Sequence, residues 1–73
     1  MYNYHINVFY SENDEGYIAD IPDLRFCSAF GETPQEAVNE VMIAKELWLE
    51  EAIESGMEIP DAKYKPAVYK IAQ

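Results

Sequence analysis

The chain has few of the groups that usually staple or anchor a small protein. Among 73 residues there is one cysteine, Cys27, and one histidine, His5, so one chain can form neither an internal disulfide nor a histidine-based structural zinc site. No apolar run approaches the ~20 residues that span a bilayer, and no basic-then-apolar leader opens the sequence. We therefore expect a soluble cytoplasmic protein of one domain, residues 1–73, without a cofactor. At this length a lone core supplies only about 3–5 kcal/mol, which favours self-association.

Basic residues are also scarce. Five lysines and arginines stand against fourteen aspartates and glutamates, which gives a formal net charge of −9. Such a chain repels phosphate backbones, so direct nucleic-acid binding is not expected, whereas a basic partner would be attracted. The charge is uneven, because residues 57–73 carry three lysines against Glu58 and Asp61 and residues 1–56 carry the rest of the acid.

Catalytic motifs are missing from most of the chain. No serine lies in a Gly-x-Ser-x-Gly turn, and Cys27 fits a small buried apolar residue better than a reactive thiol. Two carboxylate pairs, Asp20 with Asp23 and Glu36 with Glu40, have the oxygens that a divalent cation prefers. The same residues fit a strand, a turn and a helix surface equally well, so a metal-dependent nuclease is kept as an alternative.

Alternating apolar and polar residues predict three strands. In Tyr2–Tyr10 every second residue is a tyrosine, isoleucine or valine, as in a strand with one packed and one wet face. A polar connector ends at Gly16 and predicts a hairpin. The returning strand runs to Pro22, whose missing N–H closes it. After a turn at Pro22–Leu24 a third strand is predicted over Phe26–Gly31, which completes an antiparallel meander.

A long helix is predicted over Thr33–Ser55. Thr33 suits the N-cap, Pro34 suits the first helical position, and Glu36 can reach back to the cap in a capping box. Gly56 is typical of a left-handed C-terminal cap. The helical wheel assigns to the core face Ala37, Val38, Val41, Ala44, Trp48, Leu49 and Ala52, extended by Met42 and Ile53. This arc is wider than one sheet contact needs, so its edge could meet a second subunit.

The remaining segment, Lys65–Ile71, is predicted as a short fourth strand at a sheet edge, where Pro66 is tolerated. The expected fold class is therefore α+β, with a three-stranded antiparallel meander, one long helix and a short fourth strand.

The outer face of the helix has a distinct pattern. Ile43 and Leu47 lie four residues apart, opposite the core arc, and four glutamates surround them within roughly 80° of the wheel. An apolar centre with a charged rim is how many protein interfaces are arranged. Single exposed aliphatics are also common on protein surfaces. The predicted partner-binding residues are Glu36, Glu40, Ile43, Leu47, Glu50 and Glu54.

Several motifs follow one another in a specific order over residues 2–60: Gly16-Tyr17-Ile18-Ala19-Asp20-Ile21-Pro22-Asp23-Leu24, Cys27, Gly31-Glu32-Thr33-Pro34-Gln35-Glu36-Ala37, Asn39 and Trp48-Leu49-Glu50. In this order and spacing the chain resembles the HicB family of antitoxins from toxin–antitoxin pairs. The resemblance implies a partial ribonuclease-H-like fold. It also implies a small basic partner toxin, HicA, which cleaves messenger RNA with a histidine and is masked by the antitoxin.

Two departures from the family pattern stand out. Phe26 occupies the position where the family commonly has glycine, so the turn into the third strand is expected to differ. The sequence ends at Gln73, before the DNA-binding domain that many members carry, so this chain is not expected to regulate transcription alone.

The sequence thus predicts a HicB-like antitoxin domain without enzymatic activity that binds a HicA-like toxin and forms a homo-oligomer, a dimer or tetramer. A solitary oligomeric domain with no toxin partner is the alternative, and the metal-dependent nuclease is a further one. A ribonuclease-like fold does not by itself imply nuclease activity.

Overall fold

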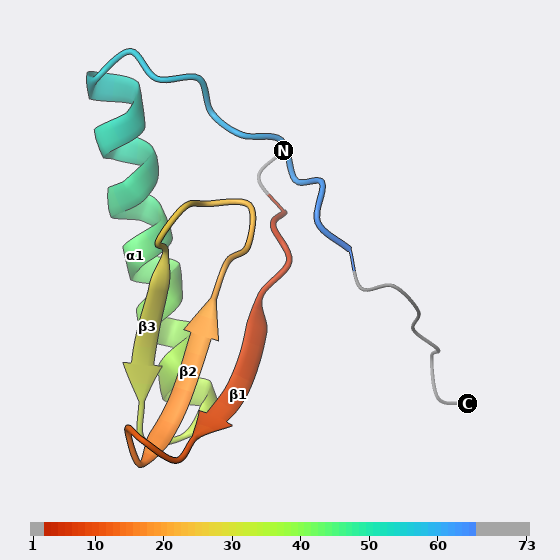
Figure 1. Cartoon of the computed structure of the whole chain (residues 1–73). Coiled ribbons are helices and arrows are strands. Elements are labelled where there is room, and N and C mark those ends of the chain that lie inside the picture. The colour runs from red at the N-terminus through yellow and green to blue at the C-terminus, as the bar shows by residue number, and fades with distance from the viewer. Residues whose placement is uncertain (1–2, 66–73) are drawn as a thin grey trace.

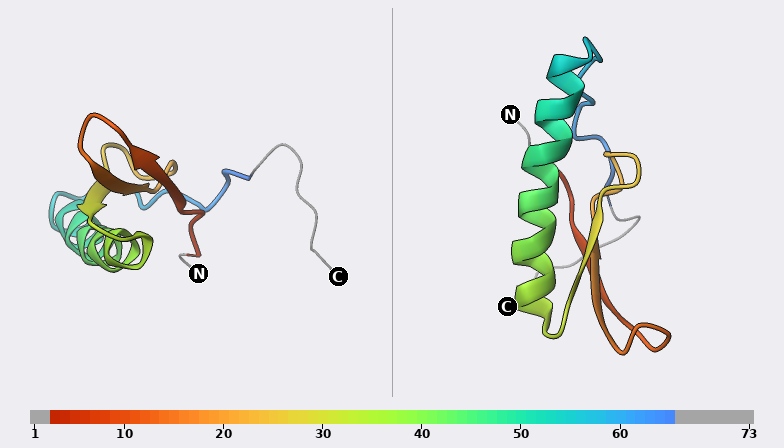
Figure 2. Two further views of the ribbon diagram at one scale, coloured as in Figure 1. Left: turned by 90° about the horizontal axis from the view of Figure 1, so that it is seen from below. Right: turned by 90° about the vertical axis from the view of Figure 1, so that its left-hand side faces the viewer.

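The computed structural model describes residues 3–65. Its regular elements are β1 (Asn7–Ser11), β2 (Gly16–Asp20), β3 (Ser28–Gly31) and α1 (Pro34–Glu54). The strands pair antiparallel in the order β1-β2-β3, and α1 covers one face of that sheet (Figures 1 and 2). The predicted α+β fold, a meander followed by one long helix, is confirmed. The predicted fourth strand lies outside the described residues except for Lys65, which belongs to no strand.

The register of the sheet sets which side chains share a face. Phe9 pairs with Ile18, and Ile18 pairs with Phe30 on the other side. Ala19, which is fully buried, belongs to the core under α1. Because neighbours along a strand point to opposite faces, Phe9, Ile18 and Phe30 form a row across the face that α1 leaves open.

Strand β1 begins at Asn7, later than the predicted Tyr2. The last pair of its register is Asn7 with Asp20, and the next residue of the β2 chain, Ile21, donates its N–H to Cys27 O at 3.0 Å instead. Residues 3–6 therefore have no strand beside them. Within them Tyr4 is buried and donates its hydroxyl to Pro60 O at 2.7 Å.

The predicted packed face of the first strand is only partly formed. Tyr4 is 8% exposed, but Val8 and Tyr10, two and three pleats further on, are 39% and 54% exposed. Helix α1 lies over β3 and β2 and reaches β1 far less (Figure 2), so the first strand keeps both of its faces partly in water.

The third strand begins at Ser28 rather than at the predicted Phe26. Two consecutive turns occupy the preceding loop, with Leu24 N–H bonded to Ile21 O and Cys27 N–H bonded to Leu24 O, both at 3.1 Å. Closing the second turn requires Phe26 to adopt a φ of 62°, which removes it from the strand. This left-handed conformation suits the glycine that the family commonly has there.

The N-terminus of α1 has the predicted capping residues, with one difference. Glu36 N–H donates to Thr33 Oγ1 at 3.1 Å, and Pro34 occupies the first turn. The Glu36 carboxylate accepts from Glu32 N–H at 2.9 Å, one residue before the cap itself. A Cβ on Gly31 would lie 2.2 Å from the backbone nitrogen of Ala37, so only glycine lets the end of β3 approach the first turn of the helix this closely.

The C-terminus of α1 is a Schellman motif. Gly56, at φ 72°, donates its N–H to Ile53 O at 3.1 Å, and Met57 N–H bonds Ala52 O at 2.8 Å. The helix therefore ends at Glu54, close to the predicted Ser55.

The core lies between α1 and the sheet, and its fully buried helix residues are Ala37, Val41 and Ala52. The sheet side and the loop after β2 contribute Tyr4, Ala19, Ile21, Leu24 and Cys27. Including Met42 and Ile53 in the monomer core was wrong, since they are 39% and 67% exposed. A sheet of three strands covers only a narrow stripe of the helix.

Residues 57–65 run from the end of α1 back past the start of β1 without regular structure (Figure 1). The Asp23 carboxylate accepts the N–H groups of Lys63 and Tyr64 at 3.1–3.2 Å, and the rings of His5 and Tyr64 lie 4.9 Å apart. Asp23, predicted as a turn former, thus also ties this segment to the loop after β2. In the described part of the chain, no helix has the length and apolarity to cross a membrane.

Candidate partner-binding surface

The outer face of α1 presents all six predicted partner-binding residues to solvent. Ile43 and Leu47 are 55% and 61% exposed, and the glutamates Glu36, Glu40, Glu50 and Glu54 are exposed around them. The opposite side of the helix packs on the sheet through Ala37 and Val41. The helix thus brings the six residues onto one free face, although nothing here tests whether a partner binds them.

A shallow hollow lies on this face between Ile43 and Leu47. Its other lining residues are Met42, Glu46 and Glu50. Two of the five lining side chains are carboxylates, so the hollow combines an apolar floor with an acidic margin.

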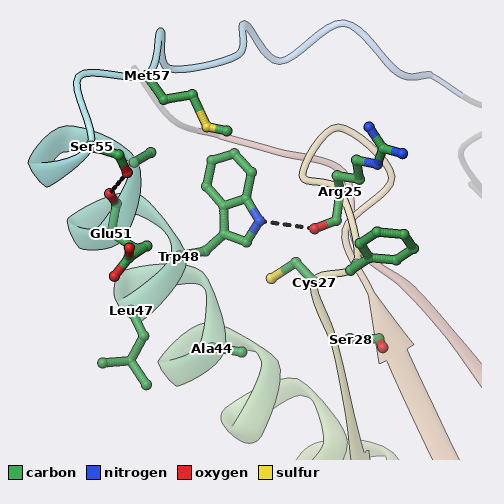
Figure 3. A pocket seen from close by; sticks show the side chains of 11 residues that line it. Arg25, Cys27, Ser28, Ala44, Leu47, Trp48, Glu51, Ser55 and Met57 are labelled. Atoms are coloured by element: carbon green, nitrogen blue, oxygen red, sulfur yellow. Dashed lines mark hydrogen bonds between the residues drawn. The ribbon is translucent and has the colours of Figure 1, made fainter.

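A larger cavity of about 650 Å³ opens beside it, between the C-terminal half of α1 and the loop that leads into β3 (Figure 3). The lining residues are Arg25, Phe26, Cys27, Ser28, Ala44, Leu47, Trp48, Glu51, Ala52, Ser55 and Met57. Most of them are apolar, as in pockets that accept an apolar side chain or ligand.

Leu47 lines both the hollow and the cavity. The exposed apolar surface therefore continues from Ile43, over Leu47, toward Phe26 and Met57, with Glu50 on one side and Glu51 on the other. We call this continuous area the helix–loop surface; it comprises the six predicted residues together with Phe26, Trp48, Glu51 and Met57.

One hydrogen bond fixes the loop to the helix at this point. Trp48 Nε1 donates to Arg25 O at 2.9 Å, across the cavity wall that Figure 3 shows. The bond satisfies the only polar group of the indole and holds the backbone next to Phe26 in place. The cavity is therefore set by a contact between residues that are 23 positions apart in sequence.

Phe26 is the most unusual residue of the surface. It is 91% exposed, and its φ of 62° is a conformation that costs a non-glycine residue about 1–2 kcal/mol. The Arg25 guanidinium carbon lies 5.2 Å from the ring centroid, which gives the ring one weak contact. An aromatic side chain held in water at a strained position is typical of a residue used in recognition.

Cys27 lies behind Phe26 and is 4% exposed. Burial, followed by the negative charge of Asp20, raises the pKa of its thiol above the ordinary value of 9.0, and Lys45 opposes the shift. The thiol is therefore protonated at neutral pH and is a poor nucleophile, in agreement with the predicted role as a buried apolar residue.

The carboxylates considered for a metal do not converge. Asp23 accepts two backbone N–H groups, and Glu36 bonds Glu32 N–H at the helix cap. Over residues 3–65 no group of three or more histidine, cysteine, aspartate or glutamate side chains is arranged to hold a metal ion. The nuclease alternative gains no support from the described residues.

Sequence reasoning found the helical half of the helix–loop surface and missed the loop half. Trp48 was assigned to the core, which is correct for its partly buried ring, but its cavity face was not anticipated. Met57 follows the helix cap and has no periodic signal. The replacement of a family glycine by Phe26 was the available clue, because a large aromatic at a glycine position needs either space or solvent.

Comparison with known proteins agrees with these features. The family described as HicB_like antitoxin of bacterial toxin-antitoxin system matches residues 4–70. The UPF0150 protein ssl0259 of Synechocystis sp. is 41% identical over 69 residues, which cover 94% of this chain and 93% of that protein. No solved structure matches, so the ribonuclease-H-like comparison stays a prediction. Since the family match spans most of the sequence, the chain belongs to the HicB-like antitoxins of bacterial toxin–antitoxin systems.

Proposed function

We propose that this chain is a non-catalytic cytoplasmic antitoxin that neutralises a small basic, mRNA-cleaving toxin of the HicA type by covering its active and RNA-binding face. It does so as a homo-oligomer and without contacting nucleic acid itself. The observation that carries the proposal is the helix–loop surface, in which exposed Ile43, Leu47 and Phe26 are bordered by glutamates.

The charges on this surface suit such a partner. A nuclease that binds RNA presents positive charge to phosphates, and Glu40, Glu50 and Glu54 offer carboxylates on the same side of one rigid helix. Complementary charge speeds encounter and selects the partner, whereas the desolvated apolar centre supplies most of the lasting affinity. The acidic rim therefore competes with RNA for the same face of the toxin.

The cavity gives this surface a second element of recognition. A side chain of the toxin that enters the space between Trp48 and Phe26 would remove Leu47 and Met57 from water together. Buried anchors of this kind, surrounded by a polar rim, dominate the binding energy of many interfaces.

Charge reversal on the outer helix face tests the proposal. The neighbouring gene product, a small basic protein, is co-expressed with the chain, and capture is measured by co-purification and by rescue of growth. The double variant Glu50→Lys/Glu54→Lys should weaken capture roughly tenfold at low salt and should make the remaining binding less sensitive to salt. Both residues are used because neither makes a capping bond, unlike Glu36.

The matched control is Glu58→Lys/Asp61→Lys, which changes the net charge equally on exposed residues outside the helix. It should leave capture nearly unchanged. Equal loss in both variants would mean that net charge, rather than this surface, governs binding. Failure of any neighbouring product to bind would favour the solitary domain, and magnesium-dependent RNA cleavage that Asp20→Asn abolishes would establish a nuclease.

A further inference from the structure

The outer edge of β1 is open. In the sheet order β1-β2-β3 only β2 pairs with it, and among residues 3–65 no other strand lies on its free side (Figure 1). Alternate N–H and C=O groups of such an edge point outward without a ladder partner and form a template for another strand.

The edge has none of the devices that usually prevent pairing. Its sequence from Asn7 to Ser11 contains no lysine and no proline, and its register with β2 runs without a bulge. Large side chains lie on both faces, since Val8, Phe9 and Tyr10 are 39%, 50% and 54% exposed. A strand with these properties is stable only when another strand or layer covers it.

Charge indicates which kind of strand fits. Residues 1–11 contain no aspartate, glutamate, lysine or arginine, whereas the chain as a whole carries −9. Two copies of so acidic a protein repel each other over most of their surface. The edge of β1 is the place where they can meet without carboxylates facing carboxylates.

The ends of the strand add charge complementarity. One end of β1 leads into the acidic turn Glu12–Glu15, and beside the other end lies the segment with Lys63 and Lys65, held there by the contact of Tyr64 with His5. Antiparallel pairing of two β1 strands brings the acidic turn of each copy toward the lysines of the other.

From these features we propose that β1 pairs antiparallel with β1 of a second copy about a two-fold axis at Phe9, which joins two sheets into one of twice the width. The rows of Phe9, Ile18 and Phe30 then continue across the dimer on one face, and both α1 helices lie on the other. The pairing closes the assembly, because each copy contributes its β1 edge once.

This inference rests on the self-association included in the proposed function and gives it a surface. Helix α1 covers β3 and β2 rather than β1, so the helix–loop surface stays accessible in the dimer. Each dimer therefore presents two partner-binding surfaces.

The oligomeric state of the full chain, measured by sedimentation over a range of concentrations, tests the pairing. The wild type should be a dimer, Phe9→Lys should be a folded monomer by circular dichroism, and Ile53→Lys should remain a dimer. Ile53 is the matched control because it is an exposed aliphatic on the edge of the predicted core arc. Dissociation by Ile53→Lys with a dimeric Phe9→Lys would assign the interface to the helix instead, and a wild-type monomer at every concentration would mean that the edge is covered within one chain; either result overturns the proposal.

A cysteine at the proposed axis gives a second test that does not depend on destabilising the dimer. Phe9→Cys should form a disulfide-linked dimer rapidly under mild oxidation, because residues opposite each other across antiparallel strands lie within disulfide distance. The buried Cys27 should not react, and Glu40→Cys on the outer helix face should cross-link far more slowly. Equal rates for the two introduced cysteines would overturn the register.

The two proposals fail separately. Phe9→Lys should still capture the toxin as a monomer, whereas Glu50→Lys/Glu54→Lys should still dimerise. Loss of capture with intact dimers therefore tests only the helix–loop surface, and loss of dimers with intact capture tests only the β1 edge.

Discussion

Phe26 shows how a single residue can be a cost to the fold and an asset to a surface. Its backbone has a conformation that glycine adopts freely, while 91% of its side chain remains in water. Burial therefore returns little of the free energy that the strained φ removes. The position is explained if the ring is covered only when a partner binds.

Replacing Phe26 should separate the two effects. Phe26→Gly should raise the free energy of unfolding by about 1 kcal/mol, because the left-handed φ no longer strains the backbone, and it should weaken toxin capture. Phe26→Ala should also weaken capture but should not gain stability, since alanine retains the strain. Urea denaturation measures the first effect and co-purification the second. A destabilised Phe26→Gly would mean that the ring supports the fold.

Cys27 should make stability sensitive to alkaline pH. Its pKa in the folded protein is raised above 9.0, mainly by burial and then by Asp20, so the folded state holds the thiol proton more tightly than the unfolded state does. The associated stability is fully present below pH 9.0 and is lost as pH rises through the folded pKa. Urea denaturation across this range should show a loss in the wild type that is absent in Cys27→Ala. Parallel pH profiles of the two proteins would contradict this assignment.

The elements form where local bonds and the pattern of apolar residues agree. Helix α1 starts with a threonine cap and a preceding carboxylate bond, and it ends with two Schellman bonds around Gly56. These bonds join residues a few positions apart, which is why the sequence predicted both ends of the helix closely. The strands were predicted less well, because their ends depend on which neighbour pairs with them.

Removal of the N-cap should test how much the local bonds of α1 contribute. Thr33→Ala deletes the acceptor of Glu36 N–H and should lower the free energy of unfolding by about 1 kcal/mol. Thr33→Ser keeps a hydroxyl and should be nearly neutral. Urea denaturation of the three proteins is the measurement. If alanine is tolerated as well as serine, the bond from Glu36 to Glu32 N–H is sufficient to cap the helix.

The whole molecule is a small core with two separate exposed apolar regions. The core contains few large side chains, of which Ile21, Leu24 and Val41 are the largest fully buried, so the monomer has little stability to spare. One apolar region is the acid-bordered helix–loop surface, and the other is the uncharged edge of β1. Their different charge is the reason for assigning a basic partner to the first and a second copy to the second.

The sequence by itself determined the order of the elements, the ends of α1, the family and the face of the helix that carries Ile43, Leu47 and the glutamates. Each of these follows from short-range bonds, periodicity or motif order within one segment. Only the tertiary structure decided that α1 leaves β1 uncovered, that Phe26 turns out of β3, and that Trp48 and Met57 complete a cavity with it. These features depend on contacts between segments far apart in the chain, such as the bond from Trp48 to Arg25, and no local pattern encodes such contacts.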